Sequence, residues 1–187
     1  KEGNKMNIEQ FEQELREARA SFYKYPEPVM GYFHWTGGHR YTSFDDYHFC
    51  VDGDGDIIYP LPLTEIPRAT WKRNKGSIAI ALCGCYGATA YRNNDGSLYA
   101  RLGDEAPTEA QIETLAQMMA KISDVFDIPL TTDHFLTHAE VAVMDNYDLD
   151  SNDPDKRWDL AILHDDDTWM SGGEILRGKA IWYQNND

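Results

Sequence analysis

The chain has 187 residues, of which 42% are hydrophobic, 12% aromatic and 26% charged. This length and apolar content can supply a sizeable core, so residues 1–187 are expected to form a single domain. No segment is long and apolar enough to cross a bilayer, which excludes membrane insertion. The 17 basic and 32 acidic residues leave a formal net charge of −15, which disfavours binding to nucleic acid and to anionic lipid surfaces.

The first predicted element is a helix over residues 7–23. Asn7 can cap it together with Gln10, and apolar residues recur at helical spacing, namely Ile8, Phe11, Leu15 and Ala18. Pro26 and Pro28 end the helix. The polar stretch 1–12 lacks the apolar core of a secretion signal, so the chain as given carries no signal peptide.

Four strand-like segments follow the helix. The segment 29–35 is continuously apolar and ends before a Gly-Gly turn. Segments 47–51 and 56–59 flank Asp-Gly-Asp-Gly at 52–55, a composition typical of a hairpin turn. The segment 77–83 is apolar without alternation, which predicts a central strand. The polar stretch 92–106 is predicted to be a loop.

The second half begins with the clearest helix, which Thr108 caps together with Gln111. Its predicted buried stripe consists of Ile112, Leu115, Met119, Ile122 and Phe126. A short apolar segment, 135–137, leads into His138, and the acidic stretch 145–156 is predicted to be a loop. A last helix is predicted over 173–183. Strands interspersed with helices, together with one hairpin, predict an α/β fold with a mixed sheet.

Several residue types that often carry chemistry have simpler interpretations here. Cys50, Cys83 and Cys85 lie in apolar, strand-like segments, so we expect reduced core residues and no disulfide framework. His48 alternates with Tyr47 and Phe49 along a strand, which favours a hydrogen-bonded structural histidine.

Three other residues could form a metal site. His34 ends an apolar strand, His138 follows one, and Asp159 is a carboxylate in apolar surroundings. A buried carboxylate is costly unless it is paired or binds a metal. Two imidazoles and one carboxylate are a known ligand set for catalytic zinc, with the fourth position left for water. Spacing alone cannot bring the three together, and a lone histidine is more often structural, so both interpretations stay open at this point.

Six motifs in order resemble the zinc-dependent N-acetylmuramoyl-L-alanine amidase family, which includes phage lysozyme-type amidases and peptidoglycan recognition proteins. They are Phe-His-Trp-Thr-Gly-Gly at 33–38, Asp-Tyr-His-Phe at 46–49, Asp-Gly-Asp-Gly at 52–55, Arg-Asn-Lys-Gly-Ser-Ile-Ala-Ile-Ala-Leu at 73–82, Thr-His-Ala-Glu-Val at 137–141 and Arg-Trp-Asp-Leu at 157–160. The resemblance covers about residues 29–163. It implies an α/β fold in which a mixed central sheet is flanked by helices and a groove on one face holds zinc.

The resemblance also implies roles for individual residues. The family's two histidine ligands correspond to His34 and His138, and its third ligand corresponds to Asp159. The family usually has a lysine two positions before the third ligand, and Arg157 stands at that position, where it would stabilise the oxyanion. The groove wall that contacts the stem peptide corresponds to Arg73 and Asn74, and Trp71 could line the same groove.

The positions that usually hold the proton carrier differ in this chain. Many relatives use a glutamate or a tyrosine, and we assign those positions to Ala81 and Arg73 in this chain. Glu140 is the substitute candidate because it is close to His138 in sequence. Glu140 could instead orient His138.

The function implied by the resemblance is zinc-dependent hydrolysis of the amide bond between N-acetylmuramic acid and L-alanine in peptidoglycan. A non-catalytic peptidoglycan-binding module of the same fold is one alternative, and a zinc amidase that recycles soluble muropeptides is another. We expect a soluble protein that acts on the cell wall after release or delivery, or a periplasmic one whose signal has been removed.

Overall fold

The computed structural model describes residues 4–187, so residues 1–3 of the expected domain and of the polar N-terminal stretch lie outside it. Its main sheet contains β1 (Lys5–Met6), β2 (Met30–Trp35), β3 (Phe49–Val51), β4 (Ile57–Ile58), β5 (Ser77–Leu82) and β8 (Phe135–Thr137). The strand order is β1-β4-β3-β5-β2-β8. Strands β3, β5, β2 and β8 are parallel, and β4 and β1 are antiparallel to their neighbours. The predicted α/β class with a mixed sheet is confirmed, and β5 is a central strand as expected.

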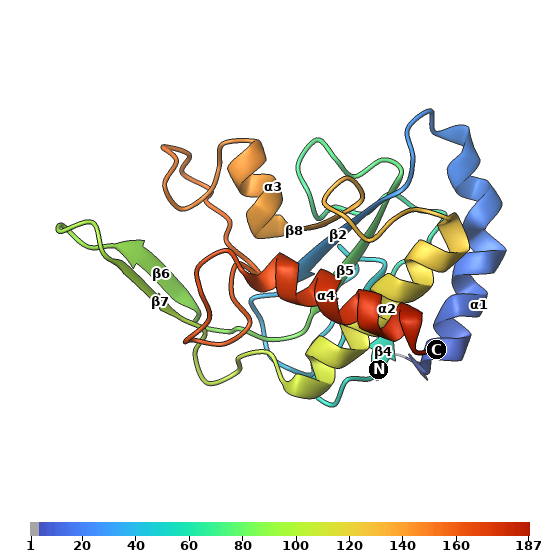
Figure 1. Ribbon diagram of the computed structural model, residues 1–187, viewed down its shortest axis with the longest axis horizontal. Helices are drawn as coiled ribbons and strands as arrows, with labels where there is room; N and C mark the ends of the chain where they lie inside the picture. The colour runs from blue at the N-terminus through green and yellow to red at the C-terminus, as the bar shows by residue number, and fades with distance from the viewer. Residues whose placement is uncertain (1–3) are drawn as a thin grey trace.

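Three long helices cover one face of this sheet (Figure 1). They are α1 (Ile8–Ala18), α2 (Glu109–Phe126) and α4 (Gly172–Asn185). Side chains alternate between the two faces of a strand. Phe33, Ile78 and Ile80 therefore point into the core beneath these helices, whereas His34 and Ala81 point to the opposite face. Across the described residues, no helix is long and apolar enough to cross a membrane.

The predicted helix starts are confirmed by their caps. Asn7 and Gln10 form a reciprocal capping box at the start of α1, and Thr108 and Gln111 form one at the start of α2. The predicted helix 7–23 is an α-helix only to Ala18 and continues as the 3₁₀ helix η1 (Arg19–Lys24). Such tighter turns are common at helix ends.

The prediction of a loop over 92–106 is wrong in part. A hairpin of β6 (Thr89–Arg92) and β7 (Leu98–Arg101) forms a second, two-stranded sheet that projects from the body (Figure 1). Ala90, Leu98 and Ala100 on one side of the hairpin pack against the protein, while the other side carries the stacked pair Tyr91 and Tyr99 beside Thr89 and Arg101. The high polarity of this segment concealed the short apolar contact face that makes it a hairpin.

A further helix, α3 (His138–Met144), was not predicted. It begins directly after β8, where Thr137 and Glu140 form another capping box. The helix has only seven residues, so it has no long apolar stripe. Its start was nevertheless readable in the sequence, because Thr137 and Glu140 have the spacing seen in the box of α2.

His48 and the cysteines have the structural roles expected of them. Cys50, Cys83 and Cys85 are buried free thiols. The Ala79 backbone N–H donates to Nδ1 of His48 at 3.1 Å, and Nε2 of His48 lies 2.8 Å from the Glu65 carbonyl oxygen. These contacts fit a neutral imidazole that carries its proton on Nε2, and burial lowers the pKa of His48 to about 4.

His48 is expected to make the protein less stable in mild acid. The unfolded chain gains a proton near pH 6.5, whereas folded His48 stays neutral until about pH 4. The stabilisation is therefore complete above pH 6.5 and is lost as the pH falls towards 4. Urea unfolding of wild type and His48→Gln, both with chelator, should show a steeper fall for wild type, by up to roughly 3 kcal/mol at the acid end. His34 is present in both proteins, so its contribution cancels, and parallel curves would contradict the assignment.

Candidate metal centre

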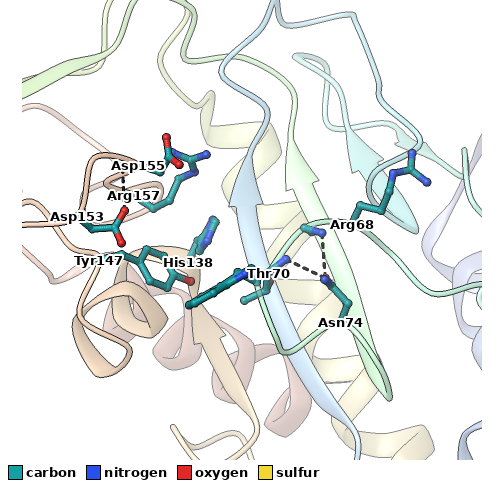
Figure 2. Close-up of a pocket in the computed structure, with 10 residues that line it drawn as sticks. Arg68, Thr70, Asn74, His138, Tyr147, Asp153, Asp155 and Arg157 are labelled. Atoms are coloured by element: carbon teal, nitrogen blue, oxygen red, sulfur yellow. Dashed lines mark hydrogen bonds between the residues drawn. The ribbon is translucent and has the colours of Figure 1, made fainter.

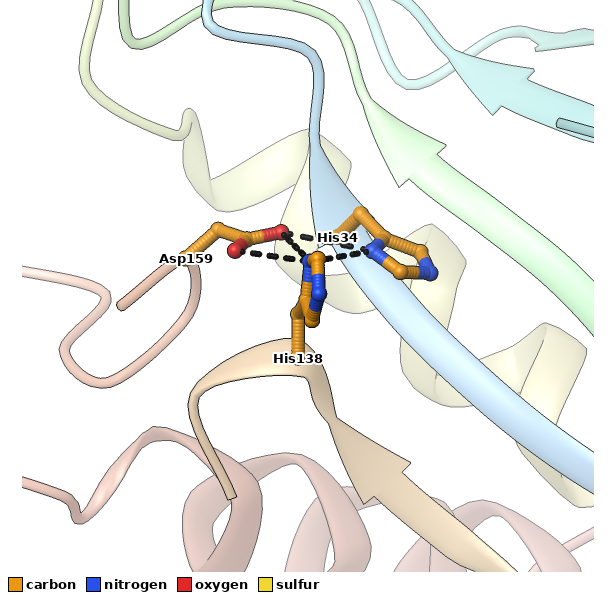
Figure 3. Close-up of side chains that lie close together, drawn as sticks. All are labelled: His34, His138 and Asp159. Atoms are coloured by element: carbon orange, nitrogen blue, oxygen red, sulfur yellow. Dashed lines mark hydrogen bonds and ion pairs between the residues drawn. The ribbon is translucent and has the colours of Figure 1, made fainter. Parts of the chain in front are cut away.

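The register of two parallel strands brings His34 and His138 together. Phe33 of β2 pairs with Thr137 of β8, and each histidine is the next residue along its chain. His34 is the fifth residue of the six-residue strand β2, and His138 is the first residue of α3. Figure 3 shows both imidazoles and the carboxylate of Asp159 directed toward one another. The two strand ends thus form one wall of a potential metal site.

Asp159 reaches this site from a loop near the C-terminal end of the chain. The Ala139 backbone N–H donates to the Asp159 carbonyl oxygen at 3.1 Å, which fixes the loop against the start of α3. On either side of Asp159, Trp158 packs edge-on against Trp35 at 4.7 Å between ring centroids, and Leu160 is fully buried. The apolar neighbours of Asp159 in the sequence therefore anchor a buried carboxylate.

The three donor atoms converge closely. His34 Nδ1 and His138 Nδ1 are 3.0 Å apart. Asp159 Oδ1 is 3.0 Å from His138 Nδ1, and Oδ2 is 3.3 Å from His34 Nδ1. Tetrahedral Zn²⁺ with bonds of about 2.0–2.2 Å separates its ligand atoms by roughly 3.3 Å. The spacing and the chemistry of this donor set therefore fit zinc.

The environment favours the protonation states that a metal requires. Burial lowers the pKa of His34 to about 4, so its imidazole is neutral near pH 7. Burial alone would raise the pKa of Asp159, but the nearby His138 and His34 outweigh that effect and hold it below its usual value. Metal binding requires neutral imidazoles and an ionised carboxylate. His34 and Asp159 both meet this requirement.

The start of α3 is held in place by Glu140 and Arg177. Glu140 Oε1 accepts from the Thr137 backbone N–H at 2.9 Å, and its carboxylate binds Arg177 of α4 through contacts of 2.8 and 2.9 Å. Arg177 also donates to the Phe135 carbonyl oxygen at 3.0 Å. A side chain at Gly173 would collide with this carboxylate, so glycine permits the close approach of α4. Within residues 4–187, Glu140 makes no hydrogen bond to His34, His138 or Asp159.

A pocket of about 560 Å³ opens beside the centre (Figure 2). Tyr147, Asp153, Asp155 and Arg157 lie on one side, Arg68 and Asn74 on the other, and His138 and Thr70 between them. Ala69 and Trp71 complete its lining. The acidic loop on the first side is closed by a hydrogen bond of 3.0 Å from the Arg157 backbone N–H to the Tyr147 carbonyl oxygen. The pocket therefore combines cationic, anionic and aromatic groups around one of the candidate ligands.

A comparison with protein families decides the chain's membership. The family model described as N-acetylmuramoyl-L-alanine amidase matches residues 17–156, a range that includes His34 and His138 and ends before Asp159. The chain belongs to this amidase family. A comparison with curated proteins gives no match.

Several solved structures resemble this family member at low sequence identity. N-acetylmuramoyl-L-alanine amidase LysC from Clostridium intestinale URNW is 19% identical, with 59% of this chain and 70% of that chain covered and a TM-score of 0.43. Endolysin amidase LysCS from the same source is 18% identical, with 59% and 68% covered and a TM-score of 0.42. The Ph2119 endolysin from Thermus scotoductus MAT2119 bacteriophage Ph2119 is 17% identical, with 65% and 82% covered and a TM-score of 0.40.

Some of the residues predicted to contact substrate in this amidase family member line the pocket, and one does not. Trp71, Asn74 and Arg157 line the pocket with His138. Arg73 does not line it, because its guanidinium forms a two-contact ion pair with Asp145 at 2.7 and 2.8 Å. Asn74 also has a structural role, since its Oδ1 accepts from two backbone N–H groups of the preceding turn.

Sequence reasoning missed other residues around the amidase centre. Tyr47 belongs to a predicted strand and to the family motif at 46–49 without a predicted role in the site, yet its ring centroid lies 5.3 Å from that of His34. Burial and the nearby Asp159 raise the pKa of Tyr47, so it keeps a hydroxyl proton to donate. Tyr147 packs edge-on against His138 at 5.8 Å between centroids. Strand alternation could not have placed Tyr47, because β3 begins only at Phe49, and no local pattern marks Tyr147.

The contacts of Glu140 predict that it positions α3. Glu140→Gln keeps an oxygen for the Thr137 N–H but loses the ion pair, so the free energy of unfolding should fall by about 2 kcal/mol. Arg177→Met removes the same pair from the other side, and the double variant should be little worse than either single one. Urea unfolding of all four proteins measures this coupling. Unchanged stability in Glu140→Gln, combined with loss of amide cleavage, would instead favour proton transfer by Glu140.

Proposed function

We propose that this chain hydrolyses the amide bond between N-acetylmuramic acid and L-alanine in peptidoglycan, with Zn²⁺ as its cofactor. Membership of the amidase family supports the reaction. The observation that carries the proposal is the convergence of His34, His138 and Asp159, whose ligand atoms all lie within 4.8 Å of one another at a buried site beside the pocket.

In this proposal His34, His138 and Asp159 hold the metal. Zn²⁺ bound there would polarise the amide carbonyl and lower the pKa of a water molecule to near neutrality. Burial of Asp159 is costly without a charged partner. A protein that only binds peptidoglycan needs no metal and therefore has no need of three buried ligands. The intact ligand set therefore favours catalysis over a binding module.

The pocket residues contribute binding and charge. Arg157 lines the pocket and binds the negative charge that develops on the amide oxygen during attack. Trp71 and Asn74 form the wall that contacts the stem peptide. Arg73 supports this wall from behind through its ion pair with Asp145. Glu140 orients His138 through the start of α3, because its carboxylate is already bound to Arg177 and to the helix cap.

Mass spectrometry of reaction products tests the proposed reaction directly. Purified peptidoglycan and soluble muropeptides would be incubated with the protein, with and without a zinc chelator. Free stem peptides that begin at L-alanine should form, disappear on chelation and return when zinc is added. Cleavage of soluble muropeptides alone would indicate a recycling enzyme, and intact substrate despite bound metal would overturn the amidase assignment.

Substitution separates the metal ligands from the pocket cation. His138→Ala should abolish zinc binding and cleavage, because two ligands cannot replace three. Arg157→Ala should keep zinc but lose roughly 10²–10³ in kcat, and Arg157→Lys should recover part of the loss. Zinc content by atomic absorption and initial rates on muropeptides measure both effects. Wild-type turnover in His138→Ala, or loss of zinc in Arg157→Ala, would show that the roles are assigned wrongly.

A further inference from the structure

The second ring nitrogen of His34 has a partner of its own. His34 is 1% exposed, and its Nδ1 faces His138 and Asp159. Its Nε2 lies 3.3 Å from Oγ1 of Thr70, which is also 1% exposed. A neutral imidazole carries one proton, on either nitrogen, and the hydrogen bond of the other nitrogen decides which.

We propose that Thr70 is a positioning residue of the metal centre: its hydroxyl oxygen accepts the Nε2–H of His34 and keeps the Nδ1 lone pair directed at the metal. The inference rests on the proposed role of His34 as a ligand. With the proton on Nε2, Nδ1 is free to coordinate. With the proton on Nδ1, His34 could donate to Asp159 but could not bind a metal. Thr70 therefore selects the tautomer that the centre needs.

The backbone around Thr70 is fixed tightly enough for this task. Asn74 Oδ1 accepts from the backbone N–H groups of Thr70 at 2.8 Å and of Ala69 at 2.9 Å. The Arg73 backbone N–H donates to the Thr70 carbonyl oxygen at 3.0 Å. Lys72 has a positive φ of 64°, which lets the chain turn back within these few residues. Asn74 thus acts on His34 through Thr70, in addition to lining the pocket.

This arrangement links the pocket wall to the first ligand. Thr70, Trp71 and Asn74 belong to one short turn and all line the pocket. Trp71 is exposed, while Thr70 beside it is buried against His34. The turn therefore presents Trp71 to the substrate and Thr70 to the metal ligand His34.

Zinc affinity tests the inference without relying on activity. Competition with a chromophoric chelator gives the dissociation constant for wild type, Thr70→Val and Thr70→Ser. Thr70→Val has nearly the same shape but leaves the Nε2–H without an acceptor, so zinc should bind roughly 10–100-fold more weakly. Thr70→Ser restores the hydroxyl and should bind zinc within about threefold of wild type.

Thr114→Val is a matched control for the loss of a threonine hydroxyl. Thr114 Oγ1 donates to the Gly55 carbonyl oxygen at 2.8 Å, on α2 and away from the centre. This variant should have a lower melting temperature and unchanged zinc affinity. If Thr70→Val does not fold, Thr70→Ala against Thr70→Ser makes the same comparison. Long-range ¹H–¹⁵N spectra of the zinc-loaded protein should place the His34 proton on Nε2.

The outcomes distinguish this inference from the proposed function. Equal zinc affinity in wild type and Thr70→Val would overturn the role of Thr70 and leave the amidase proposal standing. Tighter binding in Thr70→Val would also overturn it, because the hydroxyl would then be a donor that favours the non-binding tautomer. A wild-type protein that binds no zinc would overturn the proposed metal centre and this inference together.

Discussion

The buried carboxylate of Asp159 constrains the architecture around it. Removing a carboxylate from water is unfavourable unless other groups replace its hydration. Here Asp159 lies against two imidazoles, one near the end of β2 and one at the start of α3, with Nδ1 atoms at 3.3 and 3.0 Å from its oxygens, and a metal held between them would supply the compensating charge. The strand register, the start of α3 and the loop that carries Asp159 must all be correct for these contacts to form. One charged group thereby couples three separate segments.

The two faces of the sheet have different roles in the structure. Helices α1, α2 and α4 bury the large apolar side chains on one face, and the opposite face carries His34 and the candidate metal centre. The faces are not independent, because Arg177 of α4 binds Glu140 and the carbonyl oxygen of Phe135, the first residue of β8. The helix layer therefore supports the start of α3, where His138 is located. A side chain without contact to the metal centre can influence it through this connection.

Local rules explain what could be predicted from the sequence. The capping boxes at Asn7 and Thr108 depend on residues only three apart. The short apolar segment 77–83 is typical of a strand that is buried on both faces of a sheet. The hairpin β6–β7 and the helix α3 were missed because each is short and depends on contacts with distant segments. His34, His138 and Asp159 were selected from their apolar surroundings and from family resemblance, whereas their convergence required the strand register. Thr70 and Tyr47 have no local pattern that connects them to His34, so only the fold revealed their proximity.

The wide separation of the ligands along the chain has a consequence for biosynthesis. His34 and His138 are 104 positions apart, and Asp159 follows His138 by another 21. A ribosome must therefore release the chain beyond Asp159 before the three side chains can meet, and α4 must also emerge before Arg177 can hold the start of α3. A nascent chain has no metal centre until Asp159 has emerged. Metal uptake then favours the completed fold by mass action, since the unfolded chain offers no preformed site.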